Sequence, residues 1–211
     1  MKKGLCYMRY YIADCHFYHS AMNERMDKRG FKTVEEMNEY MIQQWNSRVR
    51  KNDEIVILGD LSFGKWKETE QLVGGLNGRK YLITGNHDRF LNEKSFNRNL
   101  FMKISGYEEM YDNGRKVILC HYPTFCYNGQ NRLDGFGNPK SYMLHGHVHN
   151  TVDQILIDKF VKETRDTKRV IQGKEQGIPC HIINCFCMWS DYIPLTLDEW
   201  IVVNERRRLE K

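Results

Sequence analysis

Stretches of β-prone and amphipathic sequence alternate along the chain. Short runs rich in Tyr, Ile, Val and Leu predict strands, whereas apolar residues at three- to four-residue spacing predict helices. A capping box formed by Thr33 and Glu36 predicts the start of a helix, and Thr196 with Glu199 predicts another. Further helix is expected over 66–76 and, briefly, from about Asn92. Strands are predicted at 7–13, 54–58, 80–84, 107–112, 115–120, 141–145 and 180–187.

The order of these elements indicates an α/β protein. The strand at 54–58, the helix at 66–76 and the strand at 80–84 favour parallel pairing with helices on the sheet faces. The turn at Asn113-Gly114 predicts a hairpin between 107–112 and 115–120. Because no repeat or linker interrupts the pattern, we expect a single domain over residues 1–211.

Composition and charge exclude several classes of protein. Hydrophobic residues make up 41% and charged residues 28%, which is typical of a globular chain and not of a disordered one. The net charge of +5 would help to attract phosphate-bearing substrates, but the chain is less basic than a dedicated nucleic-acid-binding domain is expected to be. No window approaches the roughly 18 apolar residues that a membrane helix needs, so no membrane partner is expected. Seven cysteines without a disulfide framework predict reduced thiols and a cytoplasmic protein.

Two charged segments are expected to be solvated. Residues 150–178 are rich in both signs of charge, which predicts a surface helix or excursion. The tail Arg206-Arg207-Arg208 at the end of the last helix is expected to face water in the same way.

Residues that can ligate metal follow five of the predicted strands. The clearest example is Tyr81–Asp88, where a β-prone run ends in Gly85 and then in Asn86, His87 and Asp88. Asp-x-His and His-x-His sequences place two ligands on the same side of the chain. The candidate metal ligands are Asp14, His16, Asp60, Asn86, His121, His147 and His149.

This ligand set suits transition metals. Mixed carboxylate, amide and imidazole groups favour Mn, Fe or Zn over Mg or Ca. Seven ligands are too many for one ion. They fit two divalent ions that share a bridging carboxylate about 3.5–4 Å apart, as in two-metal hydrolytic sites.

The ordered blocks resemble the calcineurin-like metallophosphoesterase family. The matching blocks are Asp14-Cys15-His16, Gly59-Asp60, Gly85-Asn86-His87-Asp88, His121 and Gly146-His147-Val148-His149. The first block continues as Asp-x-His-Phe-x-His through His19, which is most similar to small bacterial and phage members. The resemblance implies a two-sheet αββα sandwich and a metal-dependent phosphoesterase.

The resemblance also implies a role for each ligand. One metal ion would be held by Asp14, His16, Asp60 and His149, and the second by Asp60, Asn86, His121 and His147. Asp60 would bridge the two ions. Every ligand position is filled, which argues against a scaffold that has lost its metals.

Four further residues are candidates for catalysis and substrate binding. By resemblance, His87 would stabilise developing charge or protonate the leaving group. Asp88 would orient His87 or cap the following turn. His19 is expected either to contact substrate or to lie at the surface, and Arg89 to contact a phosphate.

The expected reaction is phosphodiester hydrolysis by in-line attack of a hydroxide that bridges the two metals. The stretch Gly59–Lys65 lacks the arginine of the family's protein phosphatases, which would clamp a monoester dianion. A small or cyclic nucleotide is the first choice of substrate, and the end of a single-stranded nucleic acid the second. A nuclease, a phosphomonoesterase or a non-catalytic scaffold of the same fold remain alternatives.

Other conspicuous residues have structural interpretations. Tyr127 and Phe136, in the loop 125–140, would either stack on a base or fix the loop. His145 is expected to be structural because it lies within an apolar strand. Side chains of neighbouring residues point to opposite sides of an extended chain. The thiols of Cys15 and Cys120, each next to a ligand, are therefore expected to point away from the metals and into the core.

Overall fold

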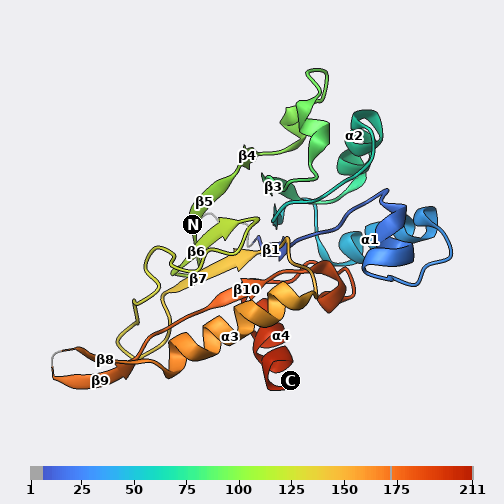
Figure 1. Cartoon of the computed structure of the whole chain (residues 1–211). Coiled ribbons are helices and arrows are strands. Elements are labelled where there is room, and N and C mark those ends of the chain that lie inside the picture. Colours follow the sequence, from blue (N-terminus) through green and yellow to red (C-terminus); the bar gives the residue numbers. More distant parts are fainter. Residues whose placement is uncertain (1–6, 172, 211) are drawn as a thin grey trace, which may run out of the picture.

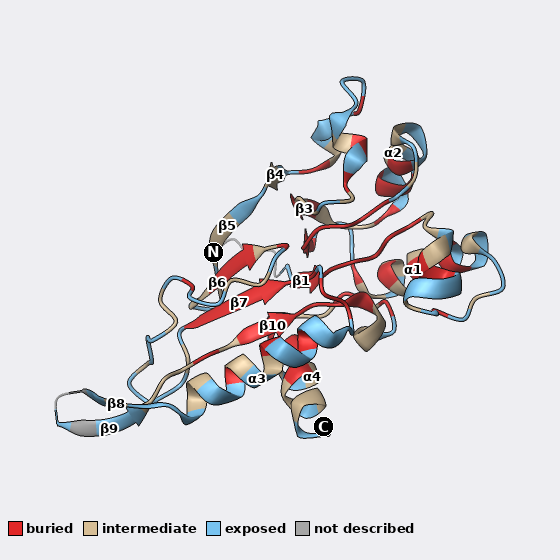
Figure 2. Cartoon of the chain, in the orientation of Figure 1, coloured by how far each residue is buried: buried red, intermediate tan, exposed pale blue. Residues whose placement is uncertain are grey.

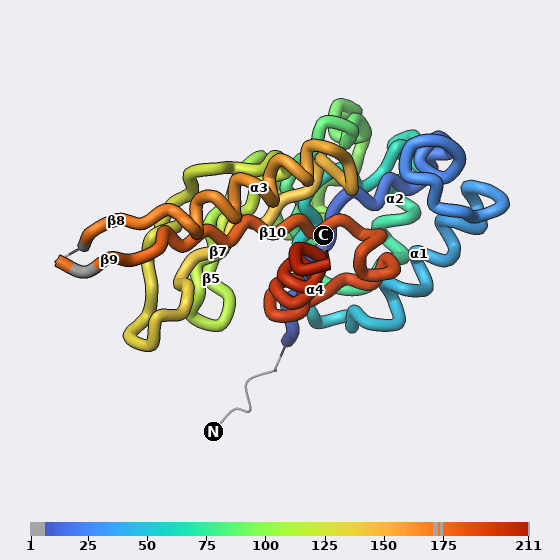
Figure 3. The backbone as a smooth tube through the Cα atoms, turned by 60° about the horizontal axis from the view of Figure 1, so that its bottom comes forward, coloured from blue at the N-terminus to red at the C-terminus, as the bar shows by residue number. Residues whose placement is uncertain are grey.

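The computed structural model describes residues 7–171 and 173–210 and contains two four-stranded sheets (Figure 1). One sheet has the strand order β1-β2-β3-β4 and is parallel throughout. The other has the order β10-β7-β6-β5, in which only β5 runs antiparallel to its neighbour. A separate two-stranded hairpin, β8-β9, projects from the body of the molecule (Figures 1 and 3).

The element bounds agree with the predicted strands and main helices to within a few residues. The strands are β1 (Arg9–Ile12), β2 (Glu54–Ile57), β3 (Arg79–Ile83), β4 (Lys103–Ser105), β5 (Tyr107–Asp112), β6 (Arg115–Cys120), β7 (Ser141–His145), β8 (Lys168–Ile171), β9 (Lys174–Gly177) and β10 (Ile182–Asn184). The helices are α1 (Val34–Arg48), α2 (Trp66–Gly75), α3 (Val152–Asp166) and α4 (Leu197–Leu209), with short turns η1 (Met22–Met26), η2 (Arg89–Asn92), η3 (Arg98–Leu100) and η4 (Cys187–Ser190).

Alternating strand residues divide the interior into three apolar layers, which confirms the αββα sandwich. The central layer lies between the sheets and includes Tyr11 of β1, Val56 of β2 and Leu144 of β7. Tyr10 and Ile55 point the other way, into a layer shared with α1 and α2. A third layer lies between the second sheet and α3. In Figure 2 strands β7 and β10 are accordingly buried along their length, whereas β5 and the parts of β8 and β9 that are coloured by burial are half-buried or exposed.

The last helix joins the two sheets. Trp200 of α4 is fully buried in the central layer, and its indole N–H donates a hydrogen bond of 2.8 Å to the carbonyl of Tyr11 in β1. Asn204, one turn later, bonds the backbone of Asn184 in β10 through both its oxygen and its nitrogen. α4 therefore ties β1 of one sheet to β10 of the other.

The charged segment 150–178 consists of two different elements. α3 covers the second sheet with Ile157 and Val161 buried, whereas Val170 in the β8-β9 hairpin is largely exposed. The amphipathic stripe of α3 is easily missed because charged residues surround it. Within the described residues, no helix is long and apolar enough to cross a bilayer.

The expectation that the arginine tail is merely solvated is wrong for two of its residues. Arg207 donates a hydrogen bond of 2.7 Å to Asp158 of α3, and Arg208 donates one of 3.1 Å to the same carboxylate. Both side chains are mostly buried because α4 packs beside α3. These ion pairs join the last helix to the outer layer.

Replacing Trp200 with alanine should destabilise the fold by about 3–5 kcal/mol, because the change leaves a large cavity between the sheets. It also removes the hydrogen-bond donor to Tyr11. Chemical denaturation of the purified variant measures the loss. Val202→Ala is the matched control, since Val202 lies on the same helix and is 65% exposed. A change below 1 kcal/mol for Trp200→Ala would contradict the role of α4 as the tie between the sheets.

Candidate metal centre

The candidate ligands follow the carboxyl ends of strands from both sheets. Asp14 and His16 follow β1, Asp60 follows β2, and Asn86 follows β3 of the first sheet. The remaining ligands follow β6 and β7 of the second sheet. Carboxyl ends of parallel strands meet at one edge of a sheet, and stacking the two sheets brings both edges together. The three ligands that follow β6 and β7 are His121, His147 and His149.

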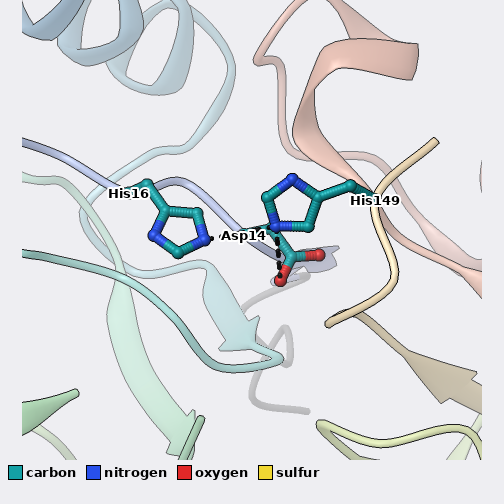
Figure 4. Close-up of side chains that lie close together, drawn as sticks. All are labelled: Asp14, His16 and His149. Atoms are coloured by element: carbon teal, nitrogen blue, oxygen red, sulfur yellow. Dashed lines mark hydrogen bonds and ion pairs between the residues drawn. The ribbon is translucent and has the colours of Figure 1, made fainter. Parts of the chain in front are cut away.

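One ligand cluster consists of Asp14, His16 and His149, all of them buried (Figure 4). The Nε2 atoms of His16 and His149 lie 3.2 Å apart. The Nε2 atom of His149 is also 3.7 Å from Oδ1 of Asp14. The three side chains therefore direct their ligand atoms toward one point.

A second ligand cluster consists of Asp60, His121 and His147. Asn86 belongs with it, because its Oδ1 atom is 3.2 Å from Nε2 of His121 and 3.0 Å from Nδ1 of His147. His147 is the least buried member and faces the opening of the site.

Asp60 lies between the two clusters. Its Oδ2 atom is 3.6 Å from Nε2 of His16 and 3.4 Å from Nε2 of His121. Its Oδ1 atom accepts a hydrogen bond of 2.8 Å from the backbone N–H of His87. One carboxylate oxygen is thus held by the backbone while the other is shared by both clusters.

Two histidines are oriented for metal binding by a hydrogen bond at Nδ1, the ring nitrogen that faces away from the cluster. Nδ1 of His121 lies 2.8 Å from the carbonyl of Leu58, an acceptor only, so that nitrogen carries the hydrogen. Nδ1 of His149 lies 2.7 Å from Oδ1 of Asp27. In the neutral form of both rings, the Nε2 atom then presents a lone pair to the cluster.

The donor set fits divalent cations. Oδ2 of Asp14 is buried and has no hydrogen-bond partner among residues 7–171 and 173–210, and such an atom is costly unless a cation satisfies it. The facing Nε2 atoms of His16 and His149 would repel each other if both carried lone pairs, and a cation between them removes this repulsion. Two buried clusters of Asp and His are consistent with a dinuclear site.

The pKa shifts favour the metal-binding form in some ligands and the protonated form in others. Burial lowers the pKa of His147 but raises that of Asp14, and the carboxylate of Asp27 raises the pKa of His149 against the effect of burial. Burial lowers the pKa of His16 to about 2, so its imidazole is neutral. Burial opposes ionisation of Asp60, but the hydrogen bond and charge of His121 outweigh it and lower the pKa of Asp60 to about 2. Burial would lower the pKa of His121, yet the carboxylates of Asp60 and Asp14 raise it to about 9. A metal ion must therefore displace a proton from His121.

Five of the seven ligands have a left-handed backbone. Asp and His tolerate this region better than most residues, but each such residue still costs roughly 1–3 kcal/mol unless its surroundings hold it. The conformation turns each side chain out of the strand direction and toward the centre. The five are Asp14 with φ 57°, His16 with φ 50°, Asp60 with φ 52°, His147 with φ 71° and His149 with φ 49°.

Two glycines allow the ligand loops to approach one another. A Cβ atom on Gly85 would lie 2.2 Å from Oδ1 of Asp60, and one on Gly59 would lie 2.3 Å from Nδ1 of His121. Gly59 also has a φ of 86°, which favours glycine. No larger residue fits at either position without moving a ligand.

His87 lies beside the first cluster and is half-buried. Its ring centroid is 5.4 Å from that of His16. Its Nδ1 atom is buried without a hydrogen-bond partner. The ring is therefore next to the ligands and is not among the two clusters.

Asp88 holds the ligand loops together. Oδ2 accepts hydrogen bonds from the backbone of Gly85 at 2.7 Å and Asp60 at 3.1 Å, and Oδ1 accepts one from Leu61 at 2.8 Å. Burial raises the pKa of Asp88 to about 6. Among the described residues Asp88 forms no hydrogen bond with the ring of His87, and it provides no side-chain cap for η2. We therefore assign Asp88 to positioning Asp60.

The two candidate substrate contacts lie on the same side of the site. His19 stacks on Phe63 with ring centroids 4.0 Å apart and an interplanar angle of 6°. Its centroid is 6.3 Å from that of His87. Arg89 is exposed at the start of η2, two residues after His87. Neither residue belongs to a ligand cluster.

Sequence reasoning missed Asp27 and Arg29, which support the first cluster. Asp27 accepts the hydrogen bond from His149 and one of 2.9 Å from Arg29. Arg29 is buried and donates to the backbone carbonyls of Cys15 at 2.6 Å and Asp14 at 3.0 Å. The pair thus connects the loop after β1 to His149. No local pattern marks Asp27-x-Arg29, because both lie in an irregular segment outside the motif blocks.

The other residues of note are structural. Cys15 and His145 are buried as expected, while Cys120 is only half-buried. Tyr127 fixes its loop, since it is buried and its hydroxyl accepts a hydrogen bond of 2.7 Å from the backbone of His181. Phe136 is 93% exposed at the tip of the same loop.

Comparison with known proteins agrees with this geometry. The chain is 36% identical over 148 residues to an uncharacterized protein of Methanocaldococcus jannaschii, covering 69% of this chain and 72% of that protein. It is 25% identical over 167 residues to the Gene 66 protein of Mycobacterium phage L5, covering 67% and 77%. A crystal structure of a protein of unknown function from Aquifex aeolicus has a similar fold, with a TM-score of 0.64, 24% identity and coverage of 92% and 97%.

The family match extends over both sheets and every ligand. Residues 10–204 match the family described as Calcineurin-like phosphoesterase. This range begins within β1 and ends within α4, so it includes the two ligand clusters and the layers that support them. The chain therefore belongs to the calcineurin-like phosphoesterase family, as its motif blocks predicted.

Proposed function

We propose that this chain is a metal-dependent phosphodiesterase that acts on nucleotide-type substrates and uses two divalent ions. The observation that carries the proposal is the position of Asp60, whose Oδ2 atom lies within 3.6 Å of histidines from both clusters. A shared carboxylate is the arrangement that holds two cations together in hydrolytic sites.

The protein groups have distinct tasks in this reaction. Two bound cations would neutralise the phosphate oxygens and lower the pKa of a water molecule. Asp14, His16, Asp60 and His149 would hold one ion, and Asp60, Asn86, His121 and His147 the other. Mn, Fe and Zn all suit these ligands. Asp27 and Leu58 keep two of the imidazoles in the metal-binding tautomer.

His87 is proposed as the general acid. It is next to the ligands but outside both clusters, and its buried Nδ1 atom has no hydrogen-bond partner in the part of the chain that the structure describes. An imidazole in this position can donate a proton to the departing oxygen.

A preference for diesters is supported by the residues after Asp60. Ser62 bonds Thr69 at 2.8 Å, and Phe63 stacks on His19. Neither provides the arginine that would bind the second charge of a phosphomonoester. Arg29, which is buried nearby, is already bonded to Asp27 and to backbone carbonyls.

Asp60→Ala should lose both metal ions, whereas His149→Ala should mainly weaken one, because only Asp60 is shared. Metal analysis of the purified proteins measures the stoichiometry, and added Mn²⁺ should raise the melting temperature of the wild type but not of Asp60→Ala. His181→Ala is a control histidine outside both clusters. Two ions retained in Asp60→Ala would refute the bridging role.

Wild-type protein loaded with Mn²⁺ should hydrolyse bis(p-nitrophenyl) phosphate with a higher kcat/KM than p-nitrophenyl phosphate. The reason is the missing arginine clamp for a dianionic phosphate. Steady-state kinetics with both substrates test this directly. A clear preference for the monoester would identify a phosphomonoesterase instead, and metal-loaded protein that hydrolyses neither would favour a scaffold.

His87→Asn should keep both metals and much of its activity on bis(p-nitrophenyl) phosphate, because p-nitrophenolate leaves without protonation. On a diester with an alkoxide leaving group it should lose about 10²–10⁴-fold in kcat. The comparison of the two leaving groups is the measurement. Equal losses would show that His87 stabilises charge on the phosphoryl group, and loss of a metal would make it a ligand.

A further inference from the structure

A groove opens on the His87 side of the metal centre. Its volume is about 640 Å³. One wall is the loop from Phe63 into the start of α2, and the other is η2 with the residue after it. The lining residues are Phe63–Glu68, Arg89, Phe90 and Glu93.

The groove is continuous with the proposed catalytic residues. The Phe63 ring lies face to face with His19, and its centroid is 5.8 Å from that of His87. The backbone N–H of Arg89 donates a hydrogen bond of 2.7 Å to the carbonyl of His87. A substrate that reaches the metals next to His87 therefore extends directly into this groove.

Three exposed cations line the groove without anionic partners. Lys65, Lys67 and Arg89 form no ion pair within the described part of the chain. Two acids, Glu68 and Glu93, also line it, so the three cations exceed the two carboxylates by one charge. The groove is left with a positive charge that is not neutralised internally.

Aromatic rings are interleaved with these cations. Phe63 is 44% exposed. Trp66 is half-buried, and the Nζ atom of Lys67 lies 5.3 Å from the centroid of its ring. Exposed rings between cations provide stacking surfaces beside phosphate-binding groups.

The opening of the metal centre is separate from the groove. It is lined by ligands of both clusters and by His87, together with Met22, Met26 and the carboxylates of Asp27 and Asp153. His87 borders this opening and lies next to Phe63 of the groove.

We propose that the groove binds the leaving-group side of a single-stranded oligonucleotide. A nucleobase would stack on Phe63 or Trp66, and the next phosphates would contact Lys65 and Arg89. This inference rests on the proposed phosphodiesterase function for two points, namely that the scissile phosphate lies at the metals and that the leaving oxygen faces His87. It specifies the substrate as a nucleic acid strand and not a small cyclic nucleotide, which would leave most of the groove empty.

The chemistry of the groove selects a single strand over other polyanions. A base can stack on a protein ring only when it is unpaired. Inorganic polyphosphate would satisfy the cations but offers no ring for Phe63 and Trp66. Removing a stacking ring and removing a cation should therefore have different effects on binding.

Binding of a fluorescein-labelled phosphorothioate oligothymidylate to Mn²⁺-loaded protein tests the inference, because the modified backbone keeps its charge and resists hydrolysis. Fluorescence anisotropy gives Kd at several salt concentrations. Arg89→Ala and Lys65→Ala should each reduce the slope of log Kd against log salt by about 0.7. Phe63→Ala should weaken binding about 5- to 150-fold and leave that slope unchanged.

Matched controls lie outside the groove. Lys94→Ala removes an exposed lysine close to η2, and Tyr111→Ala removes a ring that is 67% exposed on β5. Neither should change the slope or the affinity. Polyphosphate binding should be insensitive to Phe63→Ala. Unchanged oligothymidylate affinity in Phe63→Ala, or a loss confined to Phe136→Ala, would overturn the proposed stacking site.

The failure of this inference is distinguishable from the failure of the proposed function. Hydrolysis of bis(p-nitrophenyl) phosphate without oligothymidylate binding would overturn the groove and leave the phosphodiesterase intact. Binding with the expected slopes, but no hydrolysis of any diester, would support the groove and overturn the phosphodiesterase.

Discussion

The burial of several electron-rich side-chain atoms close together is the constraint on which the centre of this molecule depends. Within the described residues Oδ2 of Asp14 has no hydrogen-bond partner, and the Nε2 atoms of His16 and His149 face each other at 3.2 Å. Such groups are costly to bury without a counter-charge. Without a metal ion, the neighbouring carboxylates of Asp60 and Asp14 raise the pKa of His121 to about 9, so that the ring holds a proton. The fold thus maintains a site with high affinity for positive charge.

The sandwich architecture is what makes this concentration of ligands possible. Neither sheet contains enough ligands for two ions, and the shared carboxylate of Asp60 comes from one sheet while its neighbour His121 comes from the other. The two sheets are held in register by the central apolar layer and by Trp200 of α4. Near the site, Asp27 and Arg29 connect the loop after β1 to His149. Packing far from the ligands therefore sets the distance between the clusters.

Local patterns in the sequence were sufficient for most of the fold and for naming the residues that the structure brings together in two clusters, because both depend on short segments. A β-prone run followed by Gly59-Asp60 or Gly85-Asn86 marks a strand end and a ligand at once. The supporting contacts could not be predicted in this way. Arg207 and Asp158 are 49 residues apart and meet only because two helices pack together. The position of Asp27 beside His149 depends on the path of an irregular segment. Sequence alone also does not distinguish the buried Tyr127 from an exposed aromatic residue.

The left-handed backbone at Asp14, His16, Asp60, His147 and His149 has a consequence for the evolution of this protein. Glycine is the residue best suited to each of these positions if the metal is disregarded. Drift toward glycine there would relieve backbone strain and remove buried polar atoms in one step. Selection for thermal tolerance alone would therefore erode the metal site before it altered the core. Persistence of aspartate and histidine at these five positions in a lineage is accordingly a sign that the metals are in use.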